Sequence, residues 1–445
     1  MSIVSRFLQW MNKIFILQQQ SKYGGKLGLY DEFYLCHFVV FSEEYPIMAT
    51  IVSLVSDQIA PIILGALHYK PSHMVFIRSG SEKYAQNVER ICGYLKQKLA
   101  FTHEEHIVDP YNFENVLAKM RGLSASFADK PFLCNITGGT KVMALAAFQA
   151  MNERGMRSFY IDTDNSRLMT FQETKVEAEP FDPRLTVDDF VNIIGATIDS
   201  EQTPWFQNDK RLAALGNLIF RHHQEWQQTN RYFHAVQRYF PTESLEVSAP
   251  FQFTDPNGKI RIRPDIVLLQ ELNRLNLVTN LRLKGRHVEF RYADQTAKMM
   301  LFSLGLWLEY HVYETIVRLQ EQGVLHTDDL RAGVVLNWDA AEPSEHPVVN
   351  EIDVMVTKGS KLFCISCKAG DIKDTAKVLN EIELYSRRLG GIYYYPALVL
   401  VHPPNRLMRK RAELTNVKLF VLGERFPEEL AAWLMGKREG KEGNR

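Results

Sequence analysis

The sequence predicts an α/β protein in which two sheet-forming domains are joined by a smaller α+β segment. Strand-like and helix-like segments alternate from about residue 49 to residue 165, which predicts a parallel sheet with crossover helices. Near the other end, apolar segments at 350–356 and 362–368 flank the turn Lys358-Gly359-Ser360 and predict a strand hairpin. With 445 residues and an apolar fraction of 46%, the chain is long enough for two or three domains with proper cores.

The first sheet is predicted to begin with a strand over 49–55, followed by a polar turn and a helix over 59–67 that has Pro61 near its first turn. Ligands of parallel sheets bind outside the carboxyl ends of the strands. The polar turn is therefore a candidate ligand-binding segment, and it consists of Ser56, Asp57 and Gln58.

A second candidate segment follows the predicted strand 131–136 and precedes a helix that opens at Val142. It contains a glycine pair flanked by hydroxyls, with an asparagine before it: Asn135, Thr137, Gly138, Gly139, Thr140 and Lys141. Free amide groups and the helix dipole favour a phosphate at such a place. The glycine spacing matches neither the dinucleotide fingerprint nor the Walker loop, and a plain tight turn is the alternative. Both segments lie at strand ends, so they are expected to face one ligand.

The predicted hairpin near the C-terminus brings Asp353 and Lys368 to one place. A helix with apolar residues at intervals of three and four precedes it and offers Glu309 or Glu314. Those two glutamates lie roughly 140° apart around a helix, so they cannot face one site equally. A helix over 374–389 and a buried strand over 397–401 follow, giving the order helix, strand, strand, helix, strand.

This arrangement suits the hydrolysis of a phosphodiester. The scissile phosphate is negatively charged, so the reaction favours a divalent cation held by carboxylates and a lysine that orients or deprotonates water. Asp353 and Glu309 are the predicted metal ligands, joined by the backbone carbonyl of Cys367, and Lys368 is predicted to act on water and phosphate. Ser366 stands where a second acid is usual, so the site uses one metal, borrows another acid, or is impaired.

Together these segments resemble the Card and Can ancillary nucleases of type III CRISPR systems over approximately residues 48–425. The resemblance rests on Asn135 to Lys141 for a Rossmann-like CARF sensor, and on three segments for a PD-(D/E)xK nuclease: 305–309, 350–354 and 365–368. It implies a homodimer whose sensor binds a cyclic oligoadenylate, most often cyclic tetra-adenylate. Binding then allosterically activates an endonuclease that cleaves single-stranded RNA or DNA with Mg²⁺ or Mn²⁺ in antiviral defence.

The predicted domains are a sensor at 48–185, a winged-helix-like connecting domain at 186–295 and a nuclease at 296–430. Residues 1–47 are expected to form an extension outside the native fold, and 431–445 a disordered tail. In the connecting domain, a helix over 208–226 and hairpins at 252–262 and 277–292 are predicted.

Lys plus Arg equals Asp plus Glu at 52 each, so no global basic field exists for duplex DNA. Five scattered cysteines argue against a disulfide framework and for a reducing, cytoplasmic location, and no segment is predicted to span a membrane.

Two rival functions remain open. One is a ligand-responsive nucleic-acid-binding regulator with an inactive nuclease-like domain, and the other is an enzyme that turns over a small nucleotide at the glycine loop.

Overall fold

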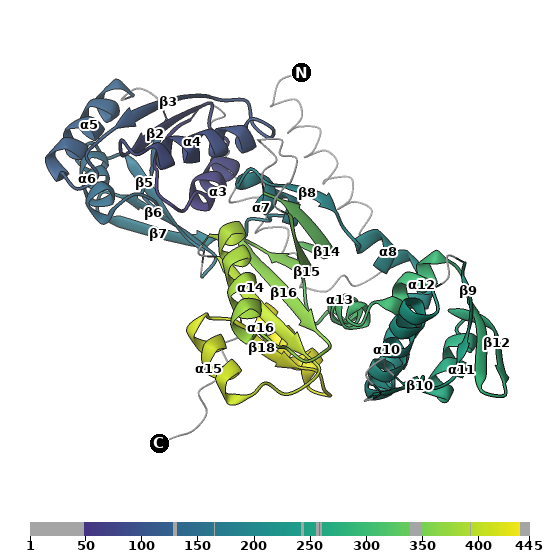
Figure 1. The fold of residues 1–445 in the computed structure, drawn as a ribbon. Coiled ribbons are helices and arrows are strands. Elements are labelled where there is room, and N and C mark those ends of the chain that lie inside the picture. Colours follow the sequence, from purple (N-terminus) through teal and green to yellow (C-terminus); the bar gives the residue numbers. More distant parts are fainter. Residues whose placement is uncertain are drawn as a thin grey trace, which may run out of the picture. The chain divides into compact units, whose positions relative to one another are not determined.

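The computed structural model describes residues 49–127, 131–163, 165–241, 244–254, 258, 260–338, 349–391 and 393–436. It is an α/β structure with two large sheets, the first in the N-terminal part and the second mainly in the C-terminal part (Figure 1). The predicted extension at 1–47 and the end of the predicted tail, 437–445, lie outside the described residues. The start of the predicted tail at 431 was wrong, because residues 431–434 belong to α16 (Phe426–Leu434), in which Ala431 and Leu434 are buried.

The first sheet has seven strands in the order β3-β2-β1-β4-β5-β6-β7. The strands from β3 to β5 are parallel, as predicted, and β6 and β7 add an antiparallel edge. Their bounds are β1 Thr50–Leu54, β2 His73–Arg78, β3 Thr102–Ile107, β4 Phe132–Asn135, β5 Arg157–Asp162, β6 Arg167–Gln172 and β7 Lys175–Pro180.

Helices cover both faces of this sheet because its central strands are apolar on both sides. Val52 and Leu54 pack with α5 and α6, whereas Val55 and Phe76 pack with α3 and α4. The helices are α3 Ala60–Tyr69, α4 Glu82–Leu95, α5 Phe113–Ser126 and α6 Lys141–Asn152. The chain winds outward in one direction from β1 and in the other from β4, so the order of the strands reverses between these two neighbours.

The segment after the first sheet differs from the predicted domain boundary. Helix α7 (Val187–Ile193) leads to β8 (Thr197–Ser200), which pairs with β14 and so forms an edge of the second sheet. The sequence analysis placed these residues in the connecting domain. The partner strand lies far along the chain, with Leu336 opposite Ile198, and no local pattern signals such a pairing.

The middle of the chain contains a three-stranded antiparallel sheet in the order β12-β13-β9 and the small pair β10 and β11. The two predicted hairpins are present, but the predicted helix over 208–226 is two helices, because the backbone leaves the helical region at His222 (φ −132°, ψ 41°). The elements are α8 Thr203–Asn208, α9 Lys210–Arg221, α10 His223–Tyr239, β9 Glu246–Pro250, β10 Phe253–Thr254, β11 Arg261–Ile262, α11 Ile266–Arg274, β12 Val278–Lys284, β13 His287–Tyr292 and α12 Gln295–Phe302.

The second sheet has six strands in the order β18-β17-β16-β15-β14-β8. The predicted order of helix, strand, strand, helix, strand was incomplete, because β14 lies between the first helix and the hairpin. Its apolar residues Val334 and Leu336 are fully buried. The bounds are α13 Leu306–Glu321, β14 Asp329–Asn337, β15 Val349–Lys358, β16 Lys361–Lys368, α14 Thr375–Gly390, β17 Tyr394–Leu400, α15 Arg406–Leu414, β18 Lys418–Val421 and α16 Phe426–Leu434.

Candidate functional site

The predicted acid and lysine of the second sheet lie together at the end of the β15–β16 hairpin. The Lys368 Nζ atom is 3.8 Å from Asp353 Oδ2. That same carboxylate oxygen accepts a hydrogen bond of 2.6 Å from the backbone N–H of Cys367 and one of 3.2 Å from the Ser366 hydroxyl. Antiparallel pairing fixes this arrangement, since Val354 lies opposite Ile365 and Asp353 comes one residue beyond that pair.

Glu309 reaches the same site from the first turn of α13. Burial, together with the negative charges of Asp353 and Glu351, raises the pKa of its carboxyl to about 8 against the opposing charge of Lys368. Glu314, the alternative on this helix, instead accepts a hydrogen bond from the hydroxyl of Tyr310 (3.2 Å). The structure therefore brings Glu309, rather than Glu314, to the hairpin acid.

Glu351 is a site residue that the sequence analysis missed. It precedes Asp353 by two positions on β15, and side chains two apart on a strand point to the same face. Burial raises the pKa of Glu351, and the charge of Asp353 adds to the effect. The alternation of the strand was the signal that could have identified it.

Opposing influences act on the pKa of Asp353. Burial raises its pKa, while Lys368, the N–H of Cys367 and the hydroxyl of Ser366 stabilise the charged form. Three carboxylates thus act on one another beside a single lysine, an arrangement typical of functional sites.

Ser366 stands in place of the usual second acid, for which three possibilities were predicted: a site with one metal, a site that borrows another acid, or an impaired site. Its hydroxyl donates to Asp353 and so orients that carboxylate. Glu351 provides an additional acid beside Asp353, which matches the possibility of a borrowed acid.

The donor set suits a hard divalent cation, because clustered carboxylates with raised pKa values gain most from a neighbouring positive charge. Among the described residues, no group of three or more His, Cys, Asp and Glu side chains is already arranged to hold a metal ion. The three carboxylates of Asp353, Glu309 and Glu351 would therefore have to move closer together to hold a cation jointly, or fewer of them would hold it with water and backbone oxygen. The carbonyl of Cys367 remains a predicted ligand.

The glycine loop of the first sheet lies against the end of β1. A Cβ atom on Gly138 would come within 2.2 Å of the Leu54 carbonyl oxygen, and one on Gly139, where φ is +75°, within 2.9 Å of the Leu54 Cβ. Glycine is required at both places for this close approach. A Cβ atom on Gly138 would also lie 3.2 Å from the Ser56 hydroxyl, so the loop lies beside the start of the polar turn, at the point where the strand order reverses.

Several polar side chains of this loop make hydrogen bonds with other groups of the protein. Asn135 is 1% exposed, donates to the Pro61 carbonyl (3.1 Å) and accepts from the Thr137 N–H (3.0 Å). The Thr140 hydroxyl caps α6 by accepting from the Met143 N–H at 3.1 Å. Asn135 and Thr140 thus shape the loop, although the sequence analysis grouped them with the ligand-contacting residues.

Thr137 and Ser56 also make internal hydrogen bonds. The Thr137 hydroxyl accepts from the Ile161 N–H at 2.9 Å, and the Ser56 hydroxyl accepts from the Gln58 N–H at 3.2 Å. The most accessible groups of the two segments are Lys141 and Asp57, both exposed.

Helix α4 contributes two further residues that the sequence analysis missed. Lys83 Nζ lies 2.7 Å from Asp57 Oδ1, and the Asn87 side chain donates to the Ser56 carbonyl at 3.0 Å. Both come from the neighbouring crossover unit, so only the parallel order of the sheet places them beside the turn.

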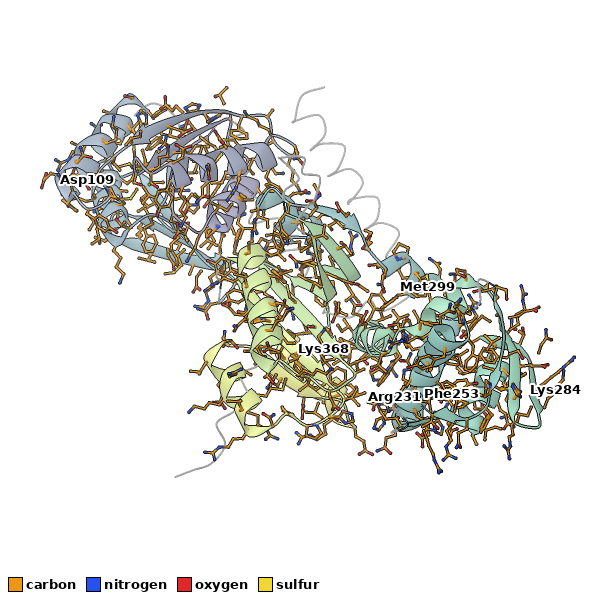
Figure 2. The ribbon with its side chains drawn as sticks, viewed as in Figure 1. Asp109, Arg231, Phe253, Lys284, Met299 and Lys368 are labelled. Carbon is orange, nitrogen blue, oxygen red and sulfur yellow. The ribbon has the colours of Figure 1, made fainter. Side chains whose placement is uncertain are left out.

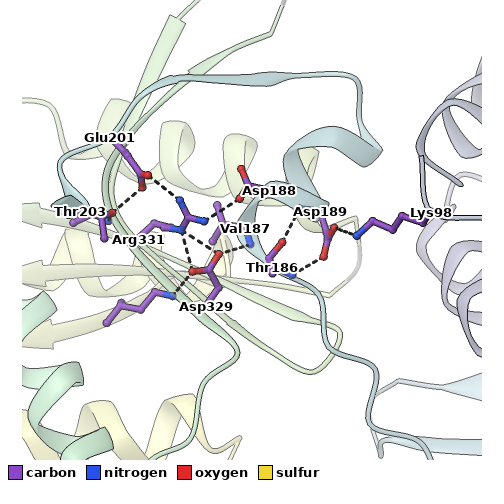
Figure 3. A network of polar contacts seen from close by, with 11 residues as sticks. Lys98, Thr186, Val187, Asp188, Asp189, Glu201, Thr203, Asp329 and Arg331 are labelled. Atoms are coloured by element: carbon purple, nitrogen blue, oxygen red, sulfur yellow. Dashed lines mark hydrogen bonds and ion pairs between the residues drawn. The ribbon is translucent and has the colours of Figure 1, made fainter. Parts of the chain in front are cut away.

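A network of polar contacts leads from the other end of α4 to the second sheet (Figure 3). Lys98 Nζ lies 2.6 Å from Asp189 Oδ1 on α7, and the hydroxyl of Tyr94 donates to the same atom at 2.9 Å. The next contacts join α7 to β14: the Val187 N–H donates to Asp329 at 3.1 Å, and Arg331 bonds Asp188 at 2.9 Å.

Family models match both sheet-forming parts of the chain. The Card1 CARF domain matches residues 50–190 and the Card1-like endonuclease domain matches residues 296–432, so together they cover more than half of the chain. The chain belongs to the Card1-like family of CARF nucleases. It therefore combines a CARF domain with an endonuclease domain, as the resemblance implied. No curated protein matches the chain by sequence.

Solved structures share the fold at low sequence identity. Can2 from Sulfobacillus thermosulfidooxidans, in complex with cyclic tetra-adenylate, is 21% identical with a TM-score of 0.65 over 87% of this chain and 98% of its own. Protein VC1899 from Vibrio cholerae is 20% identical with a TM-score of 0.68 over 87% and 97%. A type III CRISPR defence DNA nuclease activated by cyclic oligoadenylate is 17% identical with a TM-score of 0.50 over 88% and 52%.

Within the part of the chain that the structure describes, no helix combines the length and the apolar character needed to cross a membrane.

Proposed function

We propose that this protein is a nuclease activated by a cyclic oligoadenylate, which cleaves single-stranded RNA or DNA in the cytoplasm as part of type III CRISPR antiviral defence. The observation that carries the proposal is the meeting of Glu309, Glu351 and Asp353 with Lys368 at the end of one hairpin. Structures with the same fold include one bound to cyclic tetra-adenylate and one described as a DNA nuclease, which supports both halves of the proposal.

Each residue of the nuclease site has a role that follows from its surroundings. Asp353 and Glu309, with Glu351, would hold Mg²⁺ or Mn²⁺, and such an ion would supply charge stabilisation for the phosphate and lower the pKa of a water molecule. Lys368 points its ammonium toward Asp353 and places a positive charge where the phosphate binds. The Cys367 N–H and the Ser366 hydroxyl hold the Asp353 carboxylate in one orientation.

At the sensor site, the activator is proposed to bind across the strand-order reversal. Lys141 and the loop amides would contact phosphate, while Ser56, Asp57 and Gln58 with Lys83 would line the opposite side. A homodimer suits a ring-shaped ligand, because each subunit presents the same loop to it. Large exposed apolar side chains on neighbouring elements, Tyr111 at 78% and Leu145 at 63%, are compatible with such a contact.

Activation is proposed to pass through α4, which contacts the ligand segment at one end and α7 at the other. Asn87 holds the Ser56 carbonyl, and Lys98 holds Asp189. From α7, the Asp188 to Arg331 contact reaches β14, which pairs with the strand that carries Glu351 and Asp353. A shift of α4 would therefore alter the position of the nuclease carboxylates.

The deciding experiment measures cleavage of labelled single-stranded RNA and DNA with Mn²⁺, with and without cyclic tetra-adenylate. The native chain is compared with Asp353→Ala and Lys368→Ala. Activator-dependent cleavage that both substitutions abolish is the expected result. Cleavage that survives both substitutions would contradict the assignment of the site.

Ser366 keeps the inactive regulator as a second candidate, because the usual second acid is absent. That function predicts nucleic-acid binding that responds to the activator, with no cleavage under any metal. The same experiment therefore separates the two candidates when binding is recorded beside cleavage.

A further inference from the structure

One face of α10 carries a continuous stripe of polar and cationic side chains. Its members are spaced by four, four, three and four residues, which aligns them on one side of a helix. They are His223, Gln227, Arg231, His234 and Arg238. The residues that pack into the core occupy other positions, namely Trp226, Thr229, Asn230, Phe233 and Val236. The side chains of the stripe are therefore separate from the face of α10 that packs into the hydrophobic core.

The first half of the stripe contacts the loop that follows the catalytic lysine. The Gln227 side chain donates to the carbonyl of Ala369, the residue after Lys368, at 3.3 Å. The same nitrogen lies 3.3 Å from Nε2 of His402, which follows β17, and the ring of His223 is 6.1 Å from that imidazole. Figure 2 labels Arg231, the next member of the stripe, and Lys368.

The second half contacts the segment before the catalytic glutamate. His234 Nε2 lies 2.8 Å from the carbonyl oxygen of Phe302, close to the start of α13. Gly305 in this segment lies against Glu309, since a Cβ added to it would be 3.4 Å from Glu309 Oε1. The stripe thus touches the chain on both sides of the nuclease site.

The charge of this region is positive although that of the whole chain is zero. Residues 210–302 contain 14 Lys and Arg against 8 Asp and Glu. Arg231 and Arg238 are exposed, and neither makes an ion pair with any residue in the described ranges. Two exposed arginines on one helix face, with no ion-paired carboxylate among the residues that the structure describes, are suited to an anionic ligand.

Aromatic rings lie at the far end of the stripe. The Arg238 guanidinium is 5.6 Å from the ring of Tyr239, and Phe253 lies 6.0 Å from Tyr239 and 5.4 Å from Phe240, which is 38% exposed. A cationic track that ends in accessible aromatic rings is the usual surface for single strands, because unpaired bases stack on the rings while the phosphates meet the cations.

We propose that the stripe on α10 binds the phosphodiester backbone of single-stranded nucleic acid and directs it to the site at Lys368. The stripe spans roughly 22 Å of helix, long enough for several nucleotides. Arg231 and Arg238 contact phosphates, and the rings beside Arg238 accept a base. This inference rests on the proposed nuclease function and assigns its substrate-binding surface.

The test uses the full chain with Asp353→Ala, so that binding is measured without cleavage. Binding of a labelled single strand of about 30 nucleotides, as DNA and as RNA, is titrated at several salt concentrations with and without cyclic tetra-adenylate. The variant is Arg231→Glu with Arg238→Glu. The matched control is Arg274→Glu with Arg282→Glu, which makes the same change in net charge at two exposed arginines of the same region. A duplex of the same sequence is the competitor.

The stripe variant is expected to bind at least about 10-fold more weakly, with a salt slope lower by about 2. The control is expected to stay within about 2-fold of the parent. In chains that retain Asp353, the stripe variant should raise KM and leave kcat at saturation nearly unchanged, because the reversed residues contact substrate away from the scissile bond.

Unchanged binding in the stripe variant, equal weakening in both variants, or preference for the duplex would overturn this inference while leaving the nuclease function intact. The converse result, no cleavage under any condition but weaker binding in the stripe variant alone, would refute the nuclease function and keep the binding surface. Equal thermal unfolding midpoints in the two variants and the parent verify that each chain is folded.

Discussion

The two sites of this protein are built in opposite ways. At the glycine loop, the side chains of Asn135, Thr137 and Thr140 accept hydrogen bonds from backbone N–H groups, and the charged side chains of Lys141 and Asp57 are exposed. At the hairpin, acidic groups lie within electrostatic reach of one another, and the pKa of Glu309 rises to about 8 as a result of burial and its acidic neighbours.

This difference is what the proposed function requires of a ligand-binding site and of a catalytic site. A loop whose polar groups are already hydrogen-bonded holds its shape before the ligand binds, so less conformational entropy is lost on binding. Carboxylates that are partly buried beside one another are costly in their charged forms, so a neighbouring positive charge would stabilise them. Substitutions should therefore act on shape at the first site and on charge at the second.

The largest effect is expected at the nuclease charges. Asp353→Asn and Lys368→Ala should each reduce single-turnover cleavage by about 10³-fold or more, since each removes a charge that contacts the metal or the phosphate. Binding of cyclic tetra-adenylate should not change. Asp371→Asn, an exposed carboxylate beyond Lys368, serves as the control and should retain nearly full activity. A fully active Asp353→Asn chain would rule out the hairpin as the catalytic site.

The next largest effect is expected for a substitution that changes the shape of the glycine loop. Gly138→Ala would place a methyl group 2.2 Å from the Leu54 carbonyl oxygen, so the loop must move. We expect affinity for the activator to fall by roughly 10- to 100-fold, with destabilisation of about 1–3 kcal/mol from the strained backbone. Isothermal titration with cyclic tetra-adenylate measures the affinity. Gly122→Ala, where the added atom meets nothing within 4 Å, should bind normally.

The link between the sites should show a smaller effect. Lys98→Ala removes the ion pair between the segment that follows α4 and Asp189 but leaves the hydrogen bond of Tyr94, and it is expected to lower activator-stimulated cleavage about 3- to 10-fold while activator affinity changes little. The ratio of cleavage rates with and without activator is the measurement. Arg121→Ala breaks an ion pair with Glu153 within the sensor and provides the control. Equal losses in both variants would show that α4 has no special part in coupling.

The smallest effect concerns pH and stability without metal. Glu309 releases its proton near pH 4.5 when unfolded but only near pH 8 in the folded chain. The folded state therefore binds more protons across this interval, and its stability must fall as pH rises from about 4.5 to 8. Thermal unfolding in EDTA should show this decline by a few degrees, and Glu309→Gln should flatten it. Adding Mn²⁺ at pH 8 should restore the native chain but not the variant. An equal decline in both chains would show that Glu309 does not carry the effect.

Much of the architecture could be predicted from local sequence. The alternation of strands and helices indicated the parallel sheet, and apolar runs around Lys358-Gly359-Ser360 indicated the hairpin that joins Asp353 to Lys368. Strand β14 was missed because its apolar run resembles other buried segments. The predicted helix over 208–226 joined α9 to the first residues of α10, because the break at His222 carries neither glycine nor proline, and the rest of α10 was not predicted.

The sequence by itself determined which residue types stand at each strand end: the glycine loop at 137–141, the acid of β15 and the lysine of β16. Short-range pattern is enough for that, because strand alternation and turn chemistry are properties of neighbouring residues. Tertiary structure alone decided that Glu309 rather than Glu314 faces Asp353, that Glu351 joins them, and that Lys83 meets Asp57. These outcomes depend on packing between segments far apart in the chain, and burial and electrostatic coupling exist only once those segments have come together.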